Sequence, residues 1–127
     1  KGALDDYSEA IKINPENKDA FQNRGIIKTE LYQFEQAIVD FDQAIKIDPD
    51  FLEAYQNRAI AKSVLNRKDA LNDFNKVVLL DPNNGEGYYN RALHLINHNM
   101  KDYCSDLLKA KKLGFNKAQN MIVKYCK

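Results

Sequence analysis

A period of about 34 residues runs through this sequence and restricts its fold more than any other feature. Pro15, Pro49 and Pro82 lie 34 and 33 residues apart. At this spacing the segment FQNRGIIK (21–28) aligns with YQNRAIAK (55–62) and YYNRALHL (88–95). A second set of segments aligns in the same way: GALDDYSEAIKINP (2–15), QAIVDFDQAIKIDP (36–49), DALNDFNKVVLLDP (69–82) and, less closely, DYCSDLLKAKKLGF (102–115). Repeats of this length are supersecondary units that bury their apolar faces by stacking on one another.

Each repeat predicts two α-helices. In the first repeat we expect helices over residues 18–31 and 35–47. Proline after the second helix blocks its continuation, and the residue before a proline leaves the helical region. Only a few residues separate the two helices, so they must be antiparallel neighbours. The sequence therefore predicts an all-α fold of stacked helical hairpins.

The repeat resembles the tetratricopeptide repeat, in which positions 4, 8, 20, 24, 27 and 32 are aromatic, small, small, aromatic, small and proline. With Lys18 as position 1, the first repeat has Phe21, Gly25, Ala37, Phe41, Ala44 and Pro49 there. The second, from Leu52, has Tyr55, Ala59, Ala70, Phe74, Val77 and Pro82, with one residue fewer between its helices. The third, from Gly85, has Tyr88 and Ala92, but departs with Tyr103, Leu107, Ala110 and Phe115. The NRG and NRA segments are typical of bacterial-type members, and the resemblance implies a right-handed α-solenoid.

The predicted organisation has five parts. Residues 1–17 match only the second helix of a repeat, so we expect the chain to be a piece of a longer array. Residues 18–51, 52–84 and 85–116 are the three repeats, the last with a degenerate second helix. Residues 117–127 have Ala118, Met121, Ile122 and Tyr125 at helical spacing opposite lysines, which predicts a capping helix with a polar outer face.

The resemblance implies that the first helices of successive repeats line a concave groove. At about 100° per residue, positions 4, 7, 8 and 11 face the partner helix, and positions 2, 5, 6 and 9 face the groove. The predicted groove residues therefore form four rows: Asp19, Glu53 and Glu86; Gln22, Gln56 and Tyr89; Asn23, Asn57 and Asn90; Ile26, Ile60 and Leu93.

The asparagine row is the most specific of these features. One amide per repeat, at one height, offers donors and an acceptor that match the backbone of an extended peptide. The row is similar to the asparagine ladder in the superhelix of O-GlcNAc transferase and other peptide-binding tetratricopeptide proteins. Two structural alternatives stay open: the asparagines bond a neighbouring helix, or they simply belong to the repeat consensus. The aliphatic row beside them favours a contact surface.

A second binding mode of the family, the carboxylate clamp for acidic C-terminal chaperone tails, is not predicted. The clamp needs a lysine at position 5 of the first repeat, and lysine and arginine at positions 2 and 6 of the third. This sequence has Gln22, Glu86 and Asn90 there, and Glu86 would repel an acidic tail.

A row of arginines is predicted to be structural. Arg24, Arg58 and Arg91 at position 7 lie toward the partner helix, and each repeat also has an aspartate near position 23: Asp40, Asp73 and Asp106, with Asp6 in the leading segment. Because a guanidinium and a carboxylate can pair through two parallel hydrogen bonds, we expect arginine–aspartate pairs rather than an anion site.

The sequence predicts neither an enzyme nor a metal or cofactor site. His94 and His98 are four residues apart, with Cys104 nearby, but no carboxylate shares their helical register and there is no HExxH or CxxC motif. The five glycines are scattered, and no serine–histidine–aspartate arrangement has a recognisable spacing.

The charge distribution argues against nucleic acid as the partner. Residues 1–60 contain seven basic and twelve acidic side chains, whereas residues 109–127 contain six lysines and no acid. Most of the chain lacks the broad basic face that phosphate binding requires. There is no apolar run long enough to cross a bilayer, so no membrane partner is predicted.

The two cysteines, Cys104 and Cys126, are expected to be reduced and partly buried. This expectation favours a cytoplasmic location, with export from a bacterial cell left open.

Two functions follow from these patterns. The first is a protein–protein interaction module that binds a peptide or helix in the groove. The alternative is a structural element that assembles, for example as a homodimer, through the apolar stripe of the leading segment: Ala3, Leu4, Tyr7, Ala10, Ile11 and Ile13.

Overall fold

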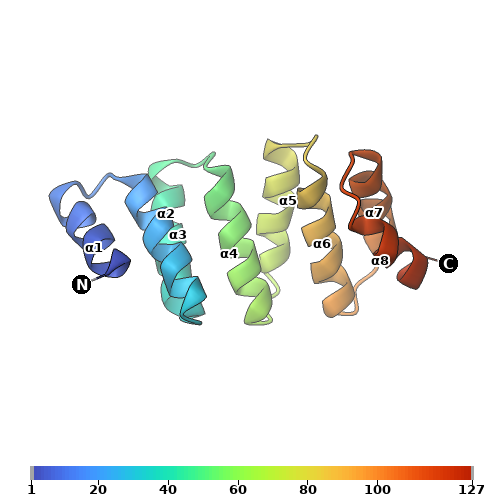
Figure 1. Cartoon of the computed structure of the whole chain (residues 1–127), viewed down its shortest axis with the longest axis horizontal. Helices are drawn as coiled ribbons and strands as arrows, with labels where there is room; N and C mark the ends of the chain where they lie inside the picture. Colours follow the sequence, from blue (N-terminus) through green and yellow to red (C-terminus); the bar gives the residue numbers. More distant parts are fainter. Residues whose placement is uncertain (1, 127) are drawn as a thin grey trace. The chain divides into compact units, whose positions relative to one another are not determined.

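The computed structural model describes residues 2–126, and within them every regular element is an α-helix (Figure 1). The all-α prediction is therefore confirmed. Lys1 and Lys127, the outer ends of the predicted first and last parts, lie outside the described residues. The helices are α1 (Ala3–Ile13), α2 (Lys18–Glu30), α3 (Phe34–Ile47), α4 (Leu52–Val64), α5 (Ala70–Leu80), α6 (Gly85–Asn97), α7 (Tyr103–Lys112) and α8 (Ala118–Tyr125).

The helices end where local chemistry requires it. Helices α1, α3 and α5 each end two residues before a proline, namely Pro15, Pro49 and Pro82. In the loop between α1 and α2, the side chain of Asn17 accepts a hydrogen bond from the backbone amide of Ala20 at 3.1 Å and caps the start of α2. The predicted bounds of 18–31 and 35–47 differ from α2 and α3 by one residue at one end each.

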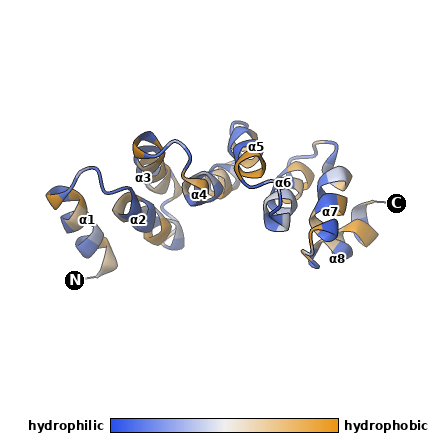
Figure 2. Cartoon of the chain, turned by 90° about the horizontal axis from the view of Figure 1, so that it is seen from above, coloured by the Kyte–Doolittle hydropathy of each residue, from blue (hydrophilic) through white to orange (hydrophobic). Residues whose placement is uncertain are grey.

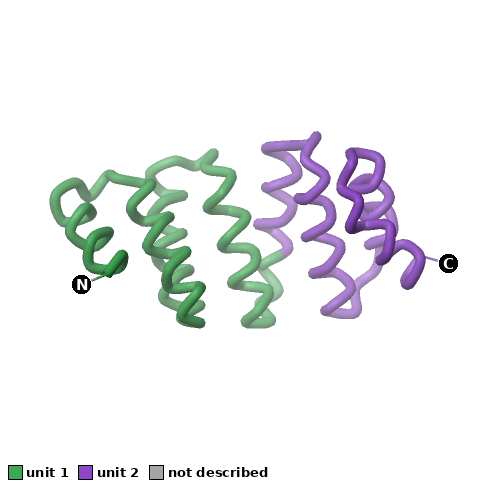
Figure 3. The backbone as a smooth tube through the Cα atoms, in the orientation of Figure 1, with its two compact units in different colours: residues 1–70 green, residues 71–127 purple. Residues whose placement is uncertain are grey.

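The chain divides into two compact units, residues 1–70 and 71–127, which are described separately (Figure 3). Helices α1 to α4 belong to the first unit, and α6 to α8 with nearly all of α5 belong to the second. Polar and apolar residues both occur along the helices (Figure 2), as expected for helices that are covered on one side. No helix in residues 2–126 has the length and apolarity needed to cross a lipid bilayer.

In unit 1, α2 lies between three other helices, since it packs against α1, α3 and α4. Phe21 of α2 forms a buried cluster with Ala44 and Ala54, and Ile11 of α1 packs against it. Gly25 allows close approach of α3, because a Cβ atom there would lie 2.6 Å from Cε1 of Phe41. The small residue of position 8 and the aromatic residue of position 24 therefore meet directly.

The apolar stripe predicted on α1 is only partly covered by α2. Ile11 contacts the cluster of unit 1, and Leu4, Tyr7 and Ala10 are half-buried. No residue of α1 is fully buried, and Ile13 is 78% exposed.

In unit 2, α7 packs against both α6 and α8. Ala92, Leu107, Ala110 and Ala118 form the buried cluster, so the small residues of three helices meet around one leucine. Met121 and Ile122 of α8 pack against this cluster, whereas Lys117 and Lys124 are exposed. Leu107 occupies the position that Phe41 has in the first repeat, and Ala92 replaces Gly25 opposite it.

The four loops that follow α2, α4, α6 and α7 have the same backbone conformation. In each, the second residue beyond the helix has a positive φ and the next amide bonds back to a carbonyl five residues earlier, as in a Schellman motif. The four amide–carbonyl distances are 2.8 to 2.9 Å. At this position the four loops have Tyr32 (φ 61°), Asn66 (φ 59°), Asn99 (φ 55°) and Gly114 (φ 94°).

The prediction of reduced cysteines is wrong. Cys104 and Cys126 form a disulfide, with an S–S distance of 2.09 Å and a Cα–Cα distance of 5.7 Å. Because α8 folds back on α7, the start of α7 lies beside the end of α8, although the two cysteines are 22 residues apart in sequence. The preference for a cytoplasmic location depended on free thiols and therefore loses its basis.

Candidate functional site

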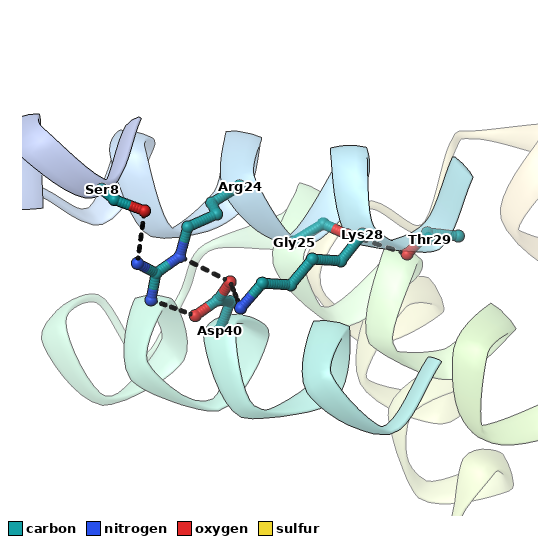
Figure 4. A network of polar contacts seen from close by, with 6 residues as sticks. All are labelled: Ser8, Arg24, Gly25, Lys28, Thr29 and Asp40. Carbon is teal, nitrogen blue, oxygen red and sulfur yellow. Dashed lines mark hydrogen bonds and ion pairs between the residues drawn. The ribbon is translucent and has the colours of Figure 1, made fainter. Parts of the chain in front are cut away.

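Arg24 ties three helices of unit 1 together (Figure 4). Its Nε and Nη2 atoms donate to the two carboxylate oxygens of Asp40 on α3, at 2.9 and 2.8 Å. Its Nη1 atom donates to Oγ of Ser8 on α1 at 3.1 Å. Lys28 Nζ also lies 3.0 Å from Asp40, whose side chain is 1% exposed. The hydrogen bond to Asp40 raises the pKa of Arg24, so its charge is committed to this network.

Arg91 repeats the arrangement in unit 2. It donates to both carboxylate oxygens of Asp106 at 2.8 and 2.6 Å, and to Oδ1 of Asn75 at 3.0 Å. The bond to Asp106 raises the pKa of Arg91. The predicted arginine–aspartate pairs are thus confirmed for Arg24 and Arg91. Arg58 and Asp73 belong to different units, and their pairing stays a prediction.

The second partner of each arginine was missed by the sequence interpretation. Arg24 bonds Ser8, Arg58 bonds Asp42 at 2.7 Å, and Arg91 bonds Asn75. These acceptors lie on the helix that precedes the arginine's own helix, two residues after Asp6, Asp40 and Asp73. The sequence does contain a signal for these contacts. The residue two positions after the aspartate is polar in each second helix that precedes a helix with such an arginine.

The aromatic residue at position 4 completes the arrangement. The guanidinium carbons of Arg24, Arg58 and Arg91 lie 5.5 to 5.8 Å from the ring centroids of Phe21, Tyr55 and Tyr88. The two tyrosines also donate to the carbonyls of Pro49 and Pro82, at 2.8 and 2.9 Å. Position 7 is therefore a packing position rather than a site for anions.

The three asparagines of position 6 are half-buried on the first helices of their repeats. Asn23 on α2 and Asn57 on α4 belong to unit 1, and Asn90 on α6 belongs to unit 2. In the part of the chain that the structure describes, none of the three amides is hydrogen-bonded to another side chain. Their donors and acceptors are available at surfaces that are partly shielded from water.

The remaining predicted groove residues differ in their exposure to solvent. Asp19, Glu53 and Glu86 are exposed, Ile60 is 40% exposed, and Gln56, Ile26 and Leu93 are half-buried.

Gln22 departs from the predicted pattern, and Tyr89 makes an additional contact. Gln22 is only 5% exposed, so its side chain does not lie on an open surface as predicted, and its amide oxygen is buried without a partner among the described residues. Tyr89 packs against Phe115, with ring centroids 4.9 Å apart. The reason is that a first helix contacts more than its own partner: α2 is covered on three sides, and Tyr89 contacts the loop before α8.

The histidine pair lies inside unit 2. His94 is 3% exposed, and its ring lies 5.2 Å from that of Phe74 and 4.3 Å from that of His98. Burial, and then the neighbouring His98, lowers the pKa of His94. Among residues 2–126 no three side chains of histidine, cysteine, aspartate or glutamate are grouped as metal ligands would be. The described residues therefore show no metal site around this pair.

Comparison with known proteins agrees with the repeat pattern. Residues 19–51 match the family model described as tetratricopeptide repeat. No curated protein matches the sequence.

Several solved structures share the fold. A MamA RS-1 ArsTM double mutant has a TM-score of 0.81 and 19% identity over 87% of this chain and 64% of its own. YrrB, whose structure is described as a TPR protein with an unusual peptide-binding site, has a TM-score of 0.77 and 23% identity over 88% of this chain and 60% of its own. The first TPR of Spaghetti (RPAP3), bound to the HSP90 peptide SRMEEVD, has a TM-score of 0.71 and 25% identity over 74% of this chain and 77% of its own.

The chain thus spans less than two thirds of the MamA and YrrB structures just named. The matched repeat and the shared helical architecture agree with the pattern that recurs at a spacing of 33 to 34 residues. Residues 19–51 are thus a tetratricopeptide repeat, and the chain has the stacked-hairpin fold of the solved structures named above.

Proposed function

We propose that this chain is a protein-interaction module that binds an extended peptide through the asparagines of position 6. The observation that carries this proposal is that Asn23, Asn57 and Asn90 recur once per repeat, are half-buried, and are not engaged by other described side chains. An amide can donate to a peptide carbonyl and accept from a peptide N–H at the same time. Such contacts depend on the peptide backbone and not on its side chains.

The related structures support a peptide as the partner. YrrB is described as having a peptide-binding site, and the Spaghetti domain is bound to a peptide. The surface of this chain differs from one that would hold an acidic tail, because Asp19, Glu53 and Glu86 are exposed on the first helices. We therefore propose a neutral or basic peptide, with apolar side chains placed against Ile26, Ile60 or Leu93.

The test begins with a peptide array that supplies a binding sequence. Affinity is then measured by calorimetric titration for the wild type and for the triple variant N23A/N57A/N90A. Each lost hydrogen bond costs about 0.5–1.5 kcal/mol. If the effects are additive, we expect affinity to fall about ten- to a thousandfold. Thermal melts of both proteins show whether the fold is retained.

The matched control is N72A/N83A/N116A, which removes three exposed asparagines at other positions. This variant should bind the peptide like the wild type. If N23A/N57A/N90A also binds normally, the asparagines have no role in recognition. If it unfolds instead, they are structural.

Self-association through α1 is a second candidate function. It is favoured by the absence of any fully buried residue on α1 and by the 78% exposure of Ile13. Sedimentation at increasing protein concentration should then give a homodimer, which the variant I13D weakens. A monomer at all concentrations would exclude this function for the chain.

A further inference from the structure

Tyr32 occupies a backbone position that suits it poorly. Of the left-handed residues two positions beyond the ends of α2, α4, α6 and α7, two are asparagines and one is glycine, the residues that adopt positive φ most readily. Only in the loop after α2 is a bulky aromatic residue found there, with φ 61°. Its side chain is nevertheless 82% exposed, so little packing compensates for the strained backbone. Strain held at a surface position points to a role outside the fold.

The surroundings of Tyr32 form a shallow, open cavity of about 300 Å³ in unit 1. The Tyr32 and Phe34 rings meet edge to face at 6.1 Å, and Leu65 at the end of α4 lies across from them. The other lining side chains are polar: Gln33, Glu35 and Gln36. The cavity thus combines two aromatic rings with one carboxylate.

The charges around the cavity favour a cation. Lys28 is paired with Asp40, and Lys62 and Arg67 are paired with Asp69 at 3.0 and 3.3 Å. Lys68, the remaining cationic residue of the loop between α4 and α5, does not line the cavity. Glu35 is exposed, and within the described residues it makes no ion pair. A ligand cation here would meet the Glu35 carboxylate, which lies in the first turn of α3 and has no ion-pair partner among the described residues, and the rings of Tyr32 and Phe34.

We propose that this cavity, which we call the Tyr32 site, binds an arginine or lysine side chain of a basic peptide segment. Cations are attracted to the faces of aromatic rings, and the chain itself uses this contact at Lys18 over Phe51, 4.9 Å from the ring centroid. Glu35 supplies the opposite charge, and the amides of Gln33 and Gln36 can accept further N–H groups. The volume fits one long side chain rather than a folded surface.

The Tyr32 site is separate from the proposed asparagine contacts. Tyr32 lies in the loop after α2, whereas Asn23 and Asn57 lie within the helices α2 and α4. The inference therefore does not depend on peptide binding by the asparagines, and either can fail alone.

The test uses five short peptides that are identical except at one position, which is arginine, lysine, citrulline, leucine or glutamate. Binding is followed by NMR shifts of the backbone amides of residues 32–36 and 65. We expect saturable shifts with the arginine and lysine peptides, and none with citrulline, leucine or glutamate. The affinity should fall as salt is added, because the carboxylate contribution is screened.

Three variants locate the interaction. Y32N has the residue found at the equivalent place after α4 and α6, so its melting temperature should equal or exceed that of the wild type. Its affinity for the arginine peptide should fall about tenfold, the scale of a lost cation–aromatic contact. Y32F keeps a ring and should bind like the wild type. E35Q should bind more weakly and with a smaller salt dependence.

The control N23A/N57A/N90A should bind the arginine peptide normally. The proposal is overturned if Y32N retains full affinity, if the leucine peptide binds as well as the arginine peptide, or if residues 32–36 do not respond to millimolar arginine peptide.

Discussion

At the scale of single residues, buried charge is the most demanding feature of this protein. Asp40 and Asp106 are almost fully buried, at 1% and 5% exposure, and each is neutralised by an arginine fork. An aspartate left alone in such a site is strongly destabilising, because its charge is neither hydrated nor paired. The two sites differ in one respect: Lys28 also contacts Asp40, whereas no second cation contacts Asp106 among the described residues.

We therefore predict that R91A costs more stability than R24A. Loss of Arg91 should lower the free energy of unfolding by about 3 kcal/mol, since Asp106 is left unpaired. R24A should cost less, because Lys28 remains 3.0 Å from Asp40. Urea unfolding of the two variants and the wild type measures both values. Equal losses would show that Lys28 contributes nothing, and R24A/K28A should then resemble R24A.

His94 gives a prediction about pH. Its pKa in the folded protein is lowered by burial and by His98, whereas the pKa of an unfolded histidine is about 6.5. Above that pH both states are neutral at this residue and no stability is lost. As the pH falls below about 6.5, the unfolded state takes up the proton first, so stability decreases until the lower folded pKa is reached. Urea unfolding between pH 7.5 and about 5 should show this loss.

The variant H94F keeps an aromatic ring beside Phe74 and cannot take up the proton. Its stability should depend less on pH than that of the wild type over the same range. Identical pH profiles for the two proteins would mean that His94 is protonated as easily in the folded as in the unfolded state.

At the scale of helices, matched side-chain sizes set the distance between neighbours. Gly25 meets the Phe41 ring, and a Cβ atom at residue 25 would lie 2.6 to 2.9 Å from three ring atoms. In unit 2 the equivalent residues are Ala92 and Leu107, so a larger residue on one helix goes with a smaller one on the other. Helix α2 gains intrinsic stability from alanine in place of glycine, by about 1 kcal/mol, but overpacking a core costs about 1–3 kcal/mol.

We predict that G25A is destabilising despite the better helix propensity, and that F41L restores part of the loss. The double variant G25A/F41L reproduces the alanine and leucine of unit 2, so its free energy of unfolding should exceed that of G25A. Guanidinium unfolding of G25A, F41L and the double variant gives the coupling between the two sites. Additive losses would show that residues 25 and 41 do not interact.

How far the sequence predicts the structure differs between elements. Helices α2 and α3 were predicted within about a residue at their ends, because proline and the apolar period act locally. The burial of Gln22 was not predictable in this way, since it depends on how many helices surround α2. The disulfide was missed for a similar reason: its two cysteines approach only because α8 folds back on α7.

For the candidate site, sequence reasoning identified the arginine–aspartate pairs but not their third partner. The rows of arginines and aspartates recur at a fixed spacing and so predict an arginine–aspartate pair within one repeat. The additional acceptors, Ser8, Asp42 and Asn75, lie instead on the helix that precedes the one carrying the arginine. The Tyr32 site was also missed, because the repeat pattern specifies no residue for the loop after the first helix. Comparison of the loops with one another shows the unusual tyrosine only once the backbone angles are known.

At the scale of the whole molecule, the chain consists of two compact units, and its disulfide belongs to the second. The bond closes a loop with a sequence separation of 22 residues, which in the chain-entropy description corresponds to about 3 kcal/mol. It connects the start of α7 to the residue that follows α8, so its loss should act mainly on α8.

We predict that C104A/C126A exchanges its amide hydrogens faster in residues 118–126, with little change in residues 18–47. Hydrogen exchange of the wild type with and without a reducing agent should show the same pattern. The double variant itself should not respond to the reducing agent. If exchange is unchanged throughout, packing of Met121 and Ile122 alone holds α8 in place.

The arginine contacts also have a consequence for how such a chain can grow. The first and second repeats each carry an arginine that bonds back to the preceding helix, Arg24 and Arg58, and a polar acceptor for the arginine of the next repeat, Asp42 and Asn75. A tandem duplication of one of these two repeats would therefore supply both the arginine and the polar acceptor at the new junction between repeats. No further substitution would be required. The copied segment would meet matching partners on either side from the moment it arose.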